Sequence, residues 1–203
     1  TGIPVYFYAL SAKRPQCENL PDIRKGEFEG LSEKMKDPYW QPDFGSNIHP
    51  SAGAVAVGTR KPLVAFNIDT SSNNRRKVLA IARKIRFSGG GYRYLQAGAA
   101  RLADRNICQV TMNLTNYQQT ALYQAIEAVR MEGKRSGIGI LATEIVGLVS
   151  SECLLSSLKY YLGLDDDEKL DLSLDEIVEL SIKHFQLRDF TKSKIIEYYL
   201  DKS

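Results

Sequence analysis

The spacing of apolar residues changes along the chain, and each spacing predicts a type of element. Apolar positions two residues apart indicate a half-buried strand, whereas spacings of three and four indicate one face of a helix. Strands are predicted over residues 2–10, 52–58, 63–68, 92–97, 107–114 and 138–146. The helical spacing occurs at Val78, Ile81, Ala82 and Ile85, and again at Leu122, Ala125, Ile126 and Val129. Three glycines at 89–91 are interpreted as the end of the first helix.

From residue 62 onward the predicted elements follow the order β-α-β-β-α-β. This order is typical of the ferredoxin-like, or split βαβ, arrangement, in which an antiparallel sheet carries both helices on one face. Helical spacing continues after Gly147, at Leu154, Leu155, Leu158 and Tyr161, at Leu174, Ile177, Val178 and Ser181, and at Ile195, Ile196, Tyr199 and Leu200. The predicted fold class is therefore α+β, with a ferredoxin-like subdomain and a helical C-terminal tail.

The first part of the chain is less regular. Its strand at 2–10 is followed by a charged stretch at 22–36 and by a segment rich in proline and aromatic residues at 37–45. Proline lacks a backbone N–H and restricts the residue before it, so this segment cannot hold a regular helix. We predict an ordered loop there.

Composition narrows the classes of protein to consider. The net charge of +3 is too small and too scattered to indicate a nucleic-acid partner. No apolar run approaches the roughly 18 residues of a membrane-spanning helix, and the N-terminus does not resemble a signal peptide. Cys17, Cys108 and Cys153 are far apart and lack metal-ligand spacing. A reduced, cytoplasmic protein with small buried cysteines is predicted.

Three features that suggest ligand chemistry have simpler explanations. The glycines at 89–91 follow a helix and precede a strand, whereas a phosphate-binding loop follows a strand and precedes a helix. Tyr92 and Tyr94 suggest an RNA-stacking surface but fall on the second strand of the subdomain rather than the third. The acidic run at 165–168 lacks the alternating ligands of a calcium loop and reads as a solvated loop.

The strand at 107–114 has one polar face. Gln109, Thr111 and Asn113 alternate with apolar residues, and Asn67 is a further amide on the strand at 63–68. This pattern fits a solvated sheet face, yet uncharged amides also suit a polar ligand that must be oriented. Both interpretations remain open from the residues alone.

The two histidines differ in context. His184 lies in a predicted helix and is interpreted as structural or exposed, whereas His49 lies in a loop of small residues at 45–53 that would let a ligand approach the backbone. No Ser-His-Asp or Cys-His arrangement follows from the spacing of residues.

The loop Trp40-Gln41-Pro42-Asp43-Phe44-Gly45 and the strand Gln-Val-Thr-Met-Asn-Leu-Thr at 109–115 belong to a longer set of recognisable segments. The others lie at 3–6, 19–31, 65–68, 144–149 and 195–200. Together these segments resemble the formiminotransferase domain of formimidoyltransferase-cyclodeaminases and of single-function glutamate formimidoyltransferases. The resemblance covers nearly the whole chain.

The resemblance implies a reaction and an architecture. Members of the family transfer the formimino group of N-formimino-L-glutamate to N5 of tetrahydrofolate, the co-substrate, during histidine degradation, and no metal is implied. Their two α/β lobes hold the folate in a groove between them. By resemblance, residues 1–61 are the end of the N-terminal subdomain and 62–203 are the C-terminal subdomain.

The resemblance also implies site residues. The folate-binding set is Asp43, Gly45, Ser46, Asn47, Ile48, His49, Pro50, Ser51, Ala52 and Gly53. The substrate-binding set is Asn67, Gln109, Asn113 and Glu144. The family's general acid/base is a histidine in a His-Gly-Glu-His-Pro-Arg-Met-Gly type motif, in the part of the first lobe ahead of the strand at 2–10. That motif is absent from the 203 residues, so no catalytic residue is assigned and little activity is expected from this chain alone.

Two hypotheses follow. The chain is a formimidoyltransferase without most of its N-terminal subdomain, or it is a non-catalytic folate-binding or interaction module that pairs with a separate N-terminal lobe. A homodimer is compatible with either.

Overall fold

The chain forms two compact units, residues 1–61 and 62–203. The computed structural model describes residues 2–60 and 62–200. The predicted subdomain ranges also include Thr1, Lys61 and residues 201–203, which lie outside the described residues. Each unit has its own hydrophobic core, as a unit that folds around its own apolar residues requires.

The first unit is built on two parallel strands, β1 (Val5–Ala9) and β2 (Val55–Thr59). Between them the chain forms η1 (Pro15–Cys17), α1 (Leu20–Arg24), α2 (Glu27–Lys34) and η2 (Pro38–Trp40). Tyr6, Cys17, Ile23, Leu31 and Met35 form its core. β2 begins three residues later than the strand predicted at 52–58, because residues 49–53 close a tight turn instead.

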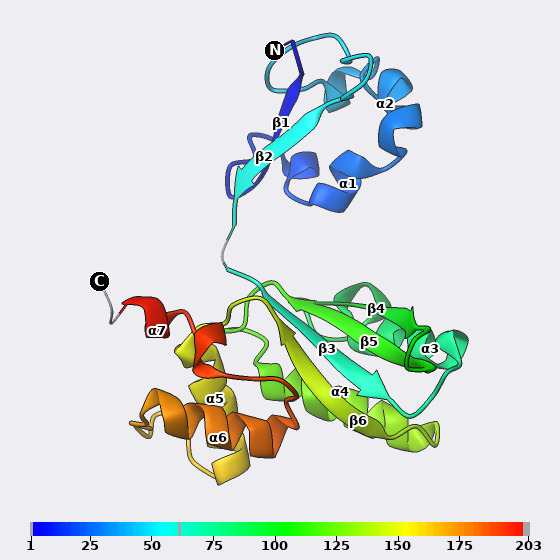
Figure 1. The fold of residues 1–203 in the computed structure, drawn as a ribbon. Helices are drawn as coiled ribbons and strands as arrows, with labels where there is room; N and C mark the ends of the chain where they lie inside the picture. The colour runs from blue at the N-terminus through cyan, green and yellow to red at the C-terminus, as the bar shows by residue number, and fades with distance from the viewer. Residues whose placement is uncertain (1, 61, 201–203) are drawn as a thin grey trace. The chain divides into compact units, whose positions relative to one another are not determined.

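The second unit contains a four-stranded antiparallel sheet (Figure 1). Its strands are β3 (Val64–Thr70), β4 (Leu95–Leu102), β5 (Ile107–Leu114) and β6 (Ile140–Val146), in the spatial order β4-β5-β3-β6. All three neighbouring pairs are antiparallel. The predicted combination of helices with an antiparallel sheet is confirmed, although β4 begins three residues later than predicted.

One face of this sheet is apolar and carries the helices. Phe66 on β3 lies opposite Met112 on β5 and Ile145 on β6, and all three side chains are buried. The apolar stripes of α3 (Arg75–Ile85) and α4 (Leu122–Arg135) belong to the same core. Because side chains alternate between the two faces of a strand, the residues between these apolar positions point to the opposite face.

The sequence predicts that the glycines at 89–91 end the first helix of this unit. This prediction is wrong. α3 ends at Ile85, and η3 (Phe87–Gly89) follows. A Cβ atom at Gly89 would lie 1.7 Å from the carbonyl oxygen of Arg83, and one at Gly91 would lie 2.0 Å from that of Ile85. Glycine is therefore required because the turn folds tightly back on the helix end.

The C-terminal part is helical, as predicted, but its last helix is short. α5 (Ser151–Leu162) and α6 (Leu174–Phe185) pack on each other, and η4 (Lys192–Lys194) and α7 (Glu197–Leu200) follow. Ile195 is buried and forms a parallel bridge with Val149, so it is not part of a helix. Among the described residues, no helix is both long and apolar enough to cross a membrane.

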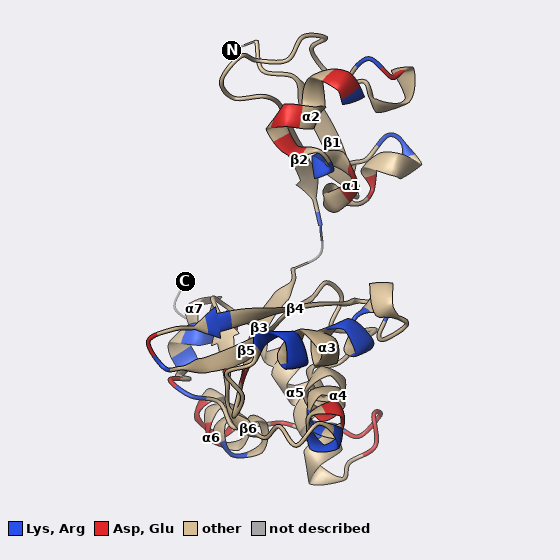
Figure 2. Cartoon of the chain, turned by 90° about the vertical axis from the view of Figure 1, so that its right-hand side faces the viewer, with Lys and Arg blue, Asp and Glu red and all other residues tan. Residues whose placement is uncertain are grey.

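Charged residues are unevenly distributed over the second unit (Figure 2). α3 carries five basic residues and no acidic one, namely Arg75, Arg76, Lys77, Arg83 and Lys84. Lys84 pairs with Glu132 on α4, and this hydrogen bond lowers the pKa of the Glu132 carboxyl. The residues at 165–168 are exposed, as expected of a solvated loop.

Candidate functional site

The face of the sheet opposite the helices is polar. Asn67 on β3 lies between Thr111 on β5 and Glu144 on β6, and Asn113 follows Thr111 on the same face of β5. The alternation read from the sequence therefore places these side chains correctly. Facing residues on neighbouring antiparallel strands have Cβ atoms about 4.5–5.5 Å apart, so their side chains can contact one ligand.

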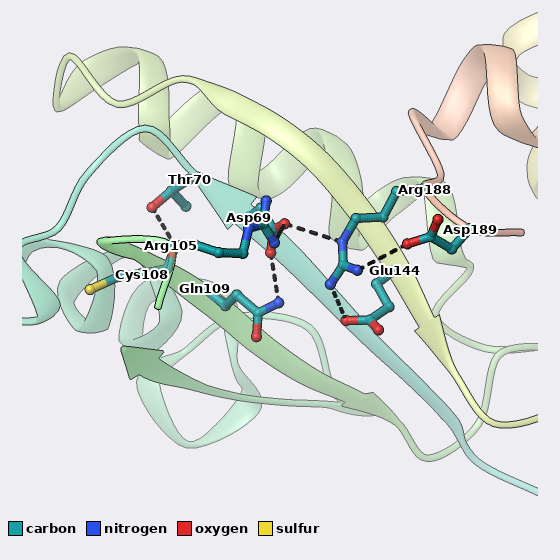
Figure 3. A network of polar contacts seen from close by, with 8 residues as sticks. All are labelled: Asp69, Thr70, Arg105, Cys108, Gln109, Glu144, Arg188 and Asp189. Atoms are coloured by element: carbon teal, nitrogen blue, oxygen red, sulfur yellow. Dashed lines mark hydrogen bonds and ion pairs between the residues drawn. The ribbon is translucent and has the colours of Figure 1, made fainter. Parts of the chain in front are cut away.

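A buried carboxylate lies on this face near the C-terminal end of β3 (Figure 3). The side chain of Asp69 is only 1% exposed. Its Oδ1 accepts a hydrogen bond of 2.6 Å from Nε2 of Gln109, and its Oδ2 accepts one of 2.6 Å from Nη1 of Arg105. A buried charge is costly unless it is paired and hydrogen-bonded, so these contacts allow an ionised group at this position.

Arg188 joins Asp69 to Glu144 on the edge strand β6. Its Nε lies 3.2 Å from Oδ2 of Asp69, and its Nη2 donates a hydrogen bond of 2.7 Å to Oε2 of Glu144. Its Nη1 lies 3.4 Å from Oδ2 of Asp189, which is largely exposed. Two arginines and two carboxylates, those of Asp69 and Glu144, thus form a charge-balanced network, with Asp189 at its edge.

Sequence reasoning missed most of this network. The strand at 63–68 was predicted to end before Asp69, and neither Arg105 nor Arg188 belongs to a periodic segment. The only available signal was that Asp69 continues the polar alternation begun by Asn67. Its arginine partners come from distant parts of the chain and could not be assigned without the strand order.

Several polar groups on this face are available to a ligand. Within the described residues, the side chains of Asn67, Thr111 and Asn113 have no hydrogen-bond partner, and neither does Oε1 of Glu144. The Glu144 side chain is 27% exposed. The face thus offers amide donors and acceptors, a hydroxyl and a carboxylate oxygen, all held on a rigid sheet.

Gln109 differs from the other predicted substrate-binding residues. It is 4% exposed, and its amide donates to Asp69. Its side chain therefore supports the network beneath the face, whereas Asn67, Asn113 and Glu144 are each partly exposed.

The predicted folate loop lies in the first unit, and Asp43 anchors its start. The carboxylate of Asp43 is 4% exposed; it accepts a hydrogen bond of 2.7 Å from the backbone N–H of Phe7 and lies 3.4 Å from Nη2 of Arg14. Gly45 has a φ of +73°, and a Cβ atom there would lie 3.1 Å from Cα of Pro4. Both residues hold the loop against β1.

The rest of this loop forms a turn closed by His49. Its backbone pairs with that of Gly53 through two hydrogen bonds, and its Nδ1 accepts from the backbone N–H of Ala52 at 3.0 Å and of Ser51 at 3.3 Å. Its ring nitrogen is thus used to shape the turn. The exposed members of the predicted folate set are Gly45, Ser46, Asn47, Pro50, Ser51 and Ala52, while Ile48 packs on the core of the unit.

The remaining candidate groups are structural. Burial raises the pKa of the Cys153 thiol to about 12, and all three cysteines are free and buried. His184 stacks on Tyr161 with ring centroids 5.5 Å apart, and burial lowers its pKa. In the part of the chain that the structure describes, no group of three or more His, Cys, Asp and Glu residues is arranged to hold a metal ion.

Comparison with known proteins gives consistent matches over both units. The formiminotransferase domain family matches residues 65–201, and the N-terminal subdomain of the formiminotransferase domain matches residues 1–60. A glutamate formimidoyltransferase from Streptococcus pyogenes is 43% identical over 166 residues, which cover 81% of this chain and 56% of the relative.

Two further relatives extend these matches. A glutamate formimidoyltransferase from Thermoplasma acidophilum is 39% identical over 88% of this chain and 61% of its own length. The formimidoyltransferase-cyclodeaminase of Mus musculus is 35% identical over the whole of this chain and 39% of its own length. The chain thus spans less than two thirds of the length of each of these relatives.

Proposed function

The chain belongs to the formiminotransferase domain family, and from this membership we propose that it takes part in folate-dependent formimino transfer in histidine degradation. In this reaction, N5 of tetrahydrofolate forms a bond to the formimino carbon of N-formimino-L-glutamate, and the bond from that carbon to the glutamate nitrogen breaks. N5 loses a proton and the departing nitrogen gains one. The relatives named as glutamate formimidoyltransferases support this assignment.

The polar face of the sheet carries the proposal for substrate binding. Asn67, Asn113 and Glu144 present groups without partners among the described residues, and they lie on one face of three adjacent strands. Glu144 faces Asn67, and Asn113 is two residues beyond Thr111, which also faces Asn67. The amide groups can orient the carboxylates of N-formimino-L-glutamate through hydrogen bonds. A few fixed polar groups of this kind give a small-molecule site its specificity.

The proposed role of Gln109 changes in the light of its contacts. Since its amide is buried and bound to Asp69, we assign it to the support of the site. The supported face then consists of Asn67, Asn113 and Glu144. Thr111 is added because it faces Asn67 and lies next to Asn113 on the same face of β5.

For folate, we propose that the first unit contributes the exposed part of its loop. Ser46, Asn47 and Ser51 offer hydroxyl, amide and backbone groups to a pterin or a carboxylate. Asp43 and His49 act indirectly in this proposal, because the side chain of each is bound to backbone N–H groups of the same unit. Glycine at 45 and 53 permits the left-handed backbone that the loop requires.

The finer architectural assignments are also proposals. The strand order β4-β5-β3-β6 with α3 and α4 on one face supports a ferredoxin-like C-terminal subdomain at 62–203. Residues 1–61 would then belong to the N-terminal subdomain. The proposal also includes a cytoplasmic location and tetrahydrofolate as co-substrate without a metal. The partner would be a second copy of the chain or a separate N-terminal lobe.

A second function is favoured by one observation. The family's histidine motif does not occur in these 203 residues, so this segment would bind its ligands without itself carrying the histidine that transfers protons. In this role it is a non-catalytic folate-binding or interaction module.

Calorimetric titration and a transfer assay separate the two functions. We expect the 203-residue chain to bind N-formimino-L-glutamate and 5-formyltetrahydrofolate, and Asn113→Ala to weaken binding of the former about 5- to 10-fold, the loss of one or two hydrogen bonds. Asn73→Ala, an exposed amide ahead of α3, serves as the matched control and should bind normally. Binding without transfer supports the second function, and failure to bind either ligand contradicts both.

A further inference from the structure

The position of Arg188 is fixed by its backbone. The segment after α6 runs beside the edge strand β6, where Leu187 forms a parallel bridge with Thr143. The N–H of Thr143 donates to the carbonyl of Gln186, and the N–H of Arg188 donates to the carbonyl of Thr143. This pairing places the Arg188 side chain beside Glu144 and lets it reach across β6 to β3 (Figure 3).

The guanidinium of Arg188 contacts one fixed and one adjustable carboxylate. Asp69 is fixed, because it is buried and its oxygens are held by Gln109 and Arg105. The Nε of Arg188 has no hydrogen-bond partner among the described residues, so its 3.2 Å contact with Asp69 is an ion pair without hydrogen-bond geometry. Glu144 is partly exposed and would sample several rotamers without this partner.

The consequence concerns the two oxygens of Glu144. Oε2 is bound to Nη2 of Arg188 at 2.7 Å, which leaves Oε1 without a partner within the described part of the chain. Asn67 lies directly opposite Glu144 in the strand register. A free carboxylate oxygen beside an amide suits a planar cationic N–C–N group, because both can accept hydrogen bonds from its N–H groups.

We propose that Asp69 and Arg188 are a positioning pair that presents Oε1 of Glu144 to the cationic formimino group of the substrate. This inference rests on the proposed function and assigns a selectivity to the same face. The formimino group is an amidine, which is protonated at neutral pH, whereas the formyl group of N-formyl-L-glutamate has a similar shape but is neutral. The pair therefore makes the site prefer a formimino donor to a formyl donor.

The test compares the two ligands on the 203-residue chain by calorimetric titration at neutral pH. The unmodified chain is expected to bind N-formimino-L-glutamate at least about 10-fold more tightly than N-formyl-L-glutamate, as a charge-assisted hydrogen bond predicts. Arg188→Met keeps an unbranched apolar stem and removes the charge and the donors of the guanidinium. Its preference should fall to less than about 3-fold, with little change in the affinity for the neutral ligand.

Three further variants separate positioning from a purely structural role. Arg188→Lys keeps the charge and should restore part of the preference, although an ammonium lacks the planar fork that spans two carboxylates. Glu144→Gln should abolish the preference while leaving the Asp69–Arg188 pair in place, which keeps the test decisive if Arg188→Met fails to fold. Arg101→Met, at an exposed arginine on β4, is the matched control and should keep the preference.

The outcomes distinguish this inference from the proposed function. If the unmodified chain binds both ligands without preference, the positioning pair is wrong and the proposed function stands. If Arg188→Met keeps the 10-fold preference, or loses affinity for both ligands equally, Arg188 does not position Glu144. If neither ligand binds the unmodified chain, both the inference and the proposed function are overturned.

Discussion

Replacing Asp69 by asparagine tests whether the buried carboxylate holds the polar face together. The change keeps the size of the side chain but removes its charge. The amide oxygen can still accept from Gln109, whereas the amide nitrogen would face the donors of Arg105 and Arg188. Two charge-assisted contacts are therefore lost, and the guanidinium donors of Arg105 and Arg188 then face the N–H donors of the new amide.

The expected loss of stability follows from these contacts. The hydrogen bond from Arg105 to the charged Asp69 contributes about 1.5–3 kcal/mol, and the Arg188 contact adds a smaller contribution because it is an ion pair without hydrogen-bond geometry. The Arg105 and Arg188 side chains are 39% and 30% exposed, so water replaces part of what they lose. We expect a net loss of about 2–3 kcal/mol. For a chain of 150–250 residues, each kcal/mol lowers Tm by about 2–4 °C, so Tm should fall by about 4–12 °C.

The assay is urea and thermal unfolding followed by circular dichroism at 222 nm. Asp104→Asn is the matched control, because Asp104 is exposed in the turn between β4 and β5 and such substitutions usually change stability by less than about 0.5 kcal/mol. If Asp69→Asn is no more destabilising than Asp104→Asn, the network contributes nothing to stability and the reasoning from its contacts is wrong.

Three further predictions concern other parts of the chain. Lys34→Met should destabilise the first unit by about 1–2 kcal/mol, because the Lys34 ammonium donates to backbone carbonyls of α1 and lies 4.0 Å from the Trp40 ring centroid. The measurement is Trp40 fluorescence in urea, and an unchanged unfolding midpoint would contradict this. Gly58→Ala should cost about 1–3 kcal/mol by the same assay, because its Cβ would lie 2.2 Å from the carbonyl oxygen of Tyr8, and a neutral effect would refute the tight pairing. Burial lowers the pKa of His184 in the folded chain, so on acidification the imidazole is protonated first in the unfolded chain. The free energy of unfolding should therefore fall as pH drops below about 6.5. His184→Gln should flatten this pH dependence, and an identical slope would exclude His184 as its source.

The sequence predicted the sheet well where burial is one-sided. The alternation at 107–114 matches β5 residue for residue, because β5 lies between β4 and β3 with one face on the helices and the other face polar. The faces of Asn67 and Asn113 followed directly from this alternation. Boundaries were less accurate where a turn interrupts the pattern, as at β2 and β4.

The sequence could not predict how the polar face is held. The strand predicted at 63–68 stops short of Asp69, which belongs to β3. A buried aspartate is favourable in a strand only where its charge is neutralised. Its neutralising partner Arg188 comes from a segment that pairs with β6 and has no period of its own. Likewise, nothing local shows that Asp43 binds the backbone of Phe7 rather than a ligand.

The central claim, that the polar face of the sheet binds N-formimino-L-glutamate, is tested most directly by nuclear magnetic resonance. The side-chain amide signals of Asn67 and Asn113 in the ¹⁵N-labelled chain would be followed during titration with the compound. We predict saturable shifts of both signals together with backbone signals of β3, β5 and β6, and saturation at about 10-fold higher ligand concentration in Glu144→Gln, because one charge-assisted hydrogen bond is lost. Binding that leaves both amide signals unchanged, or shifts confined to other elements, would contradict the account.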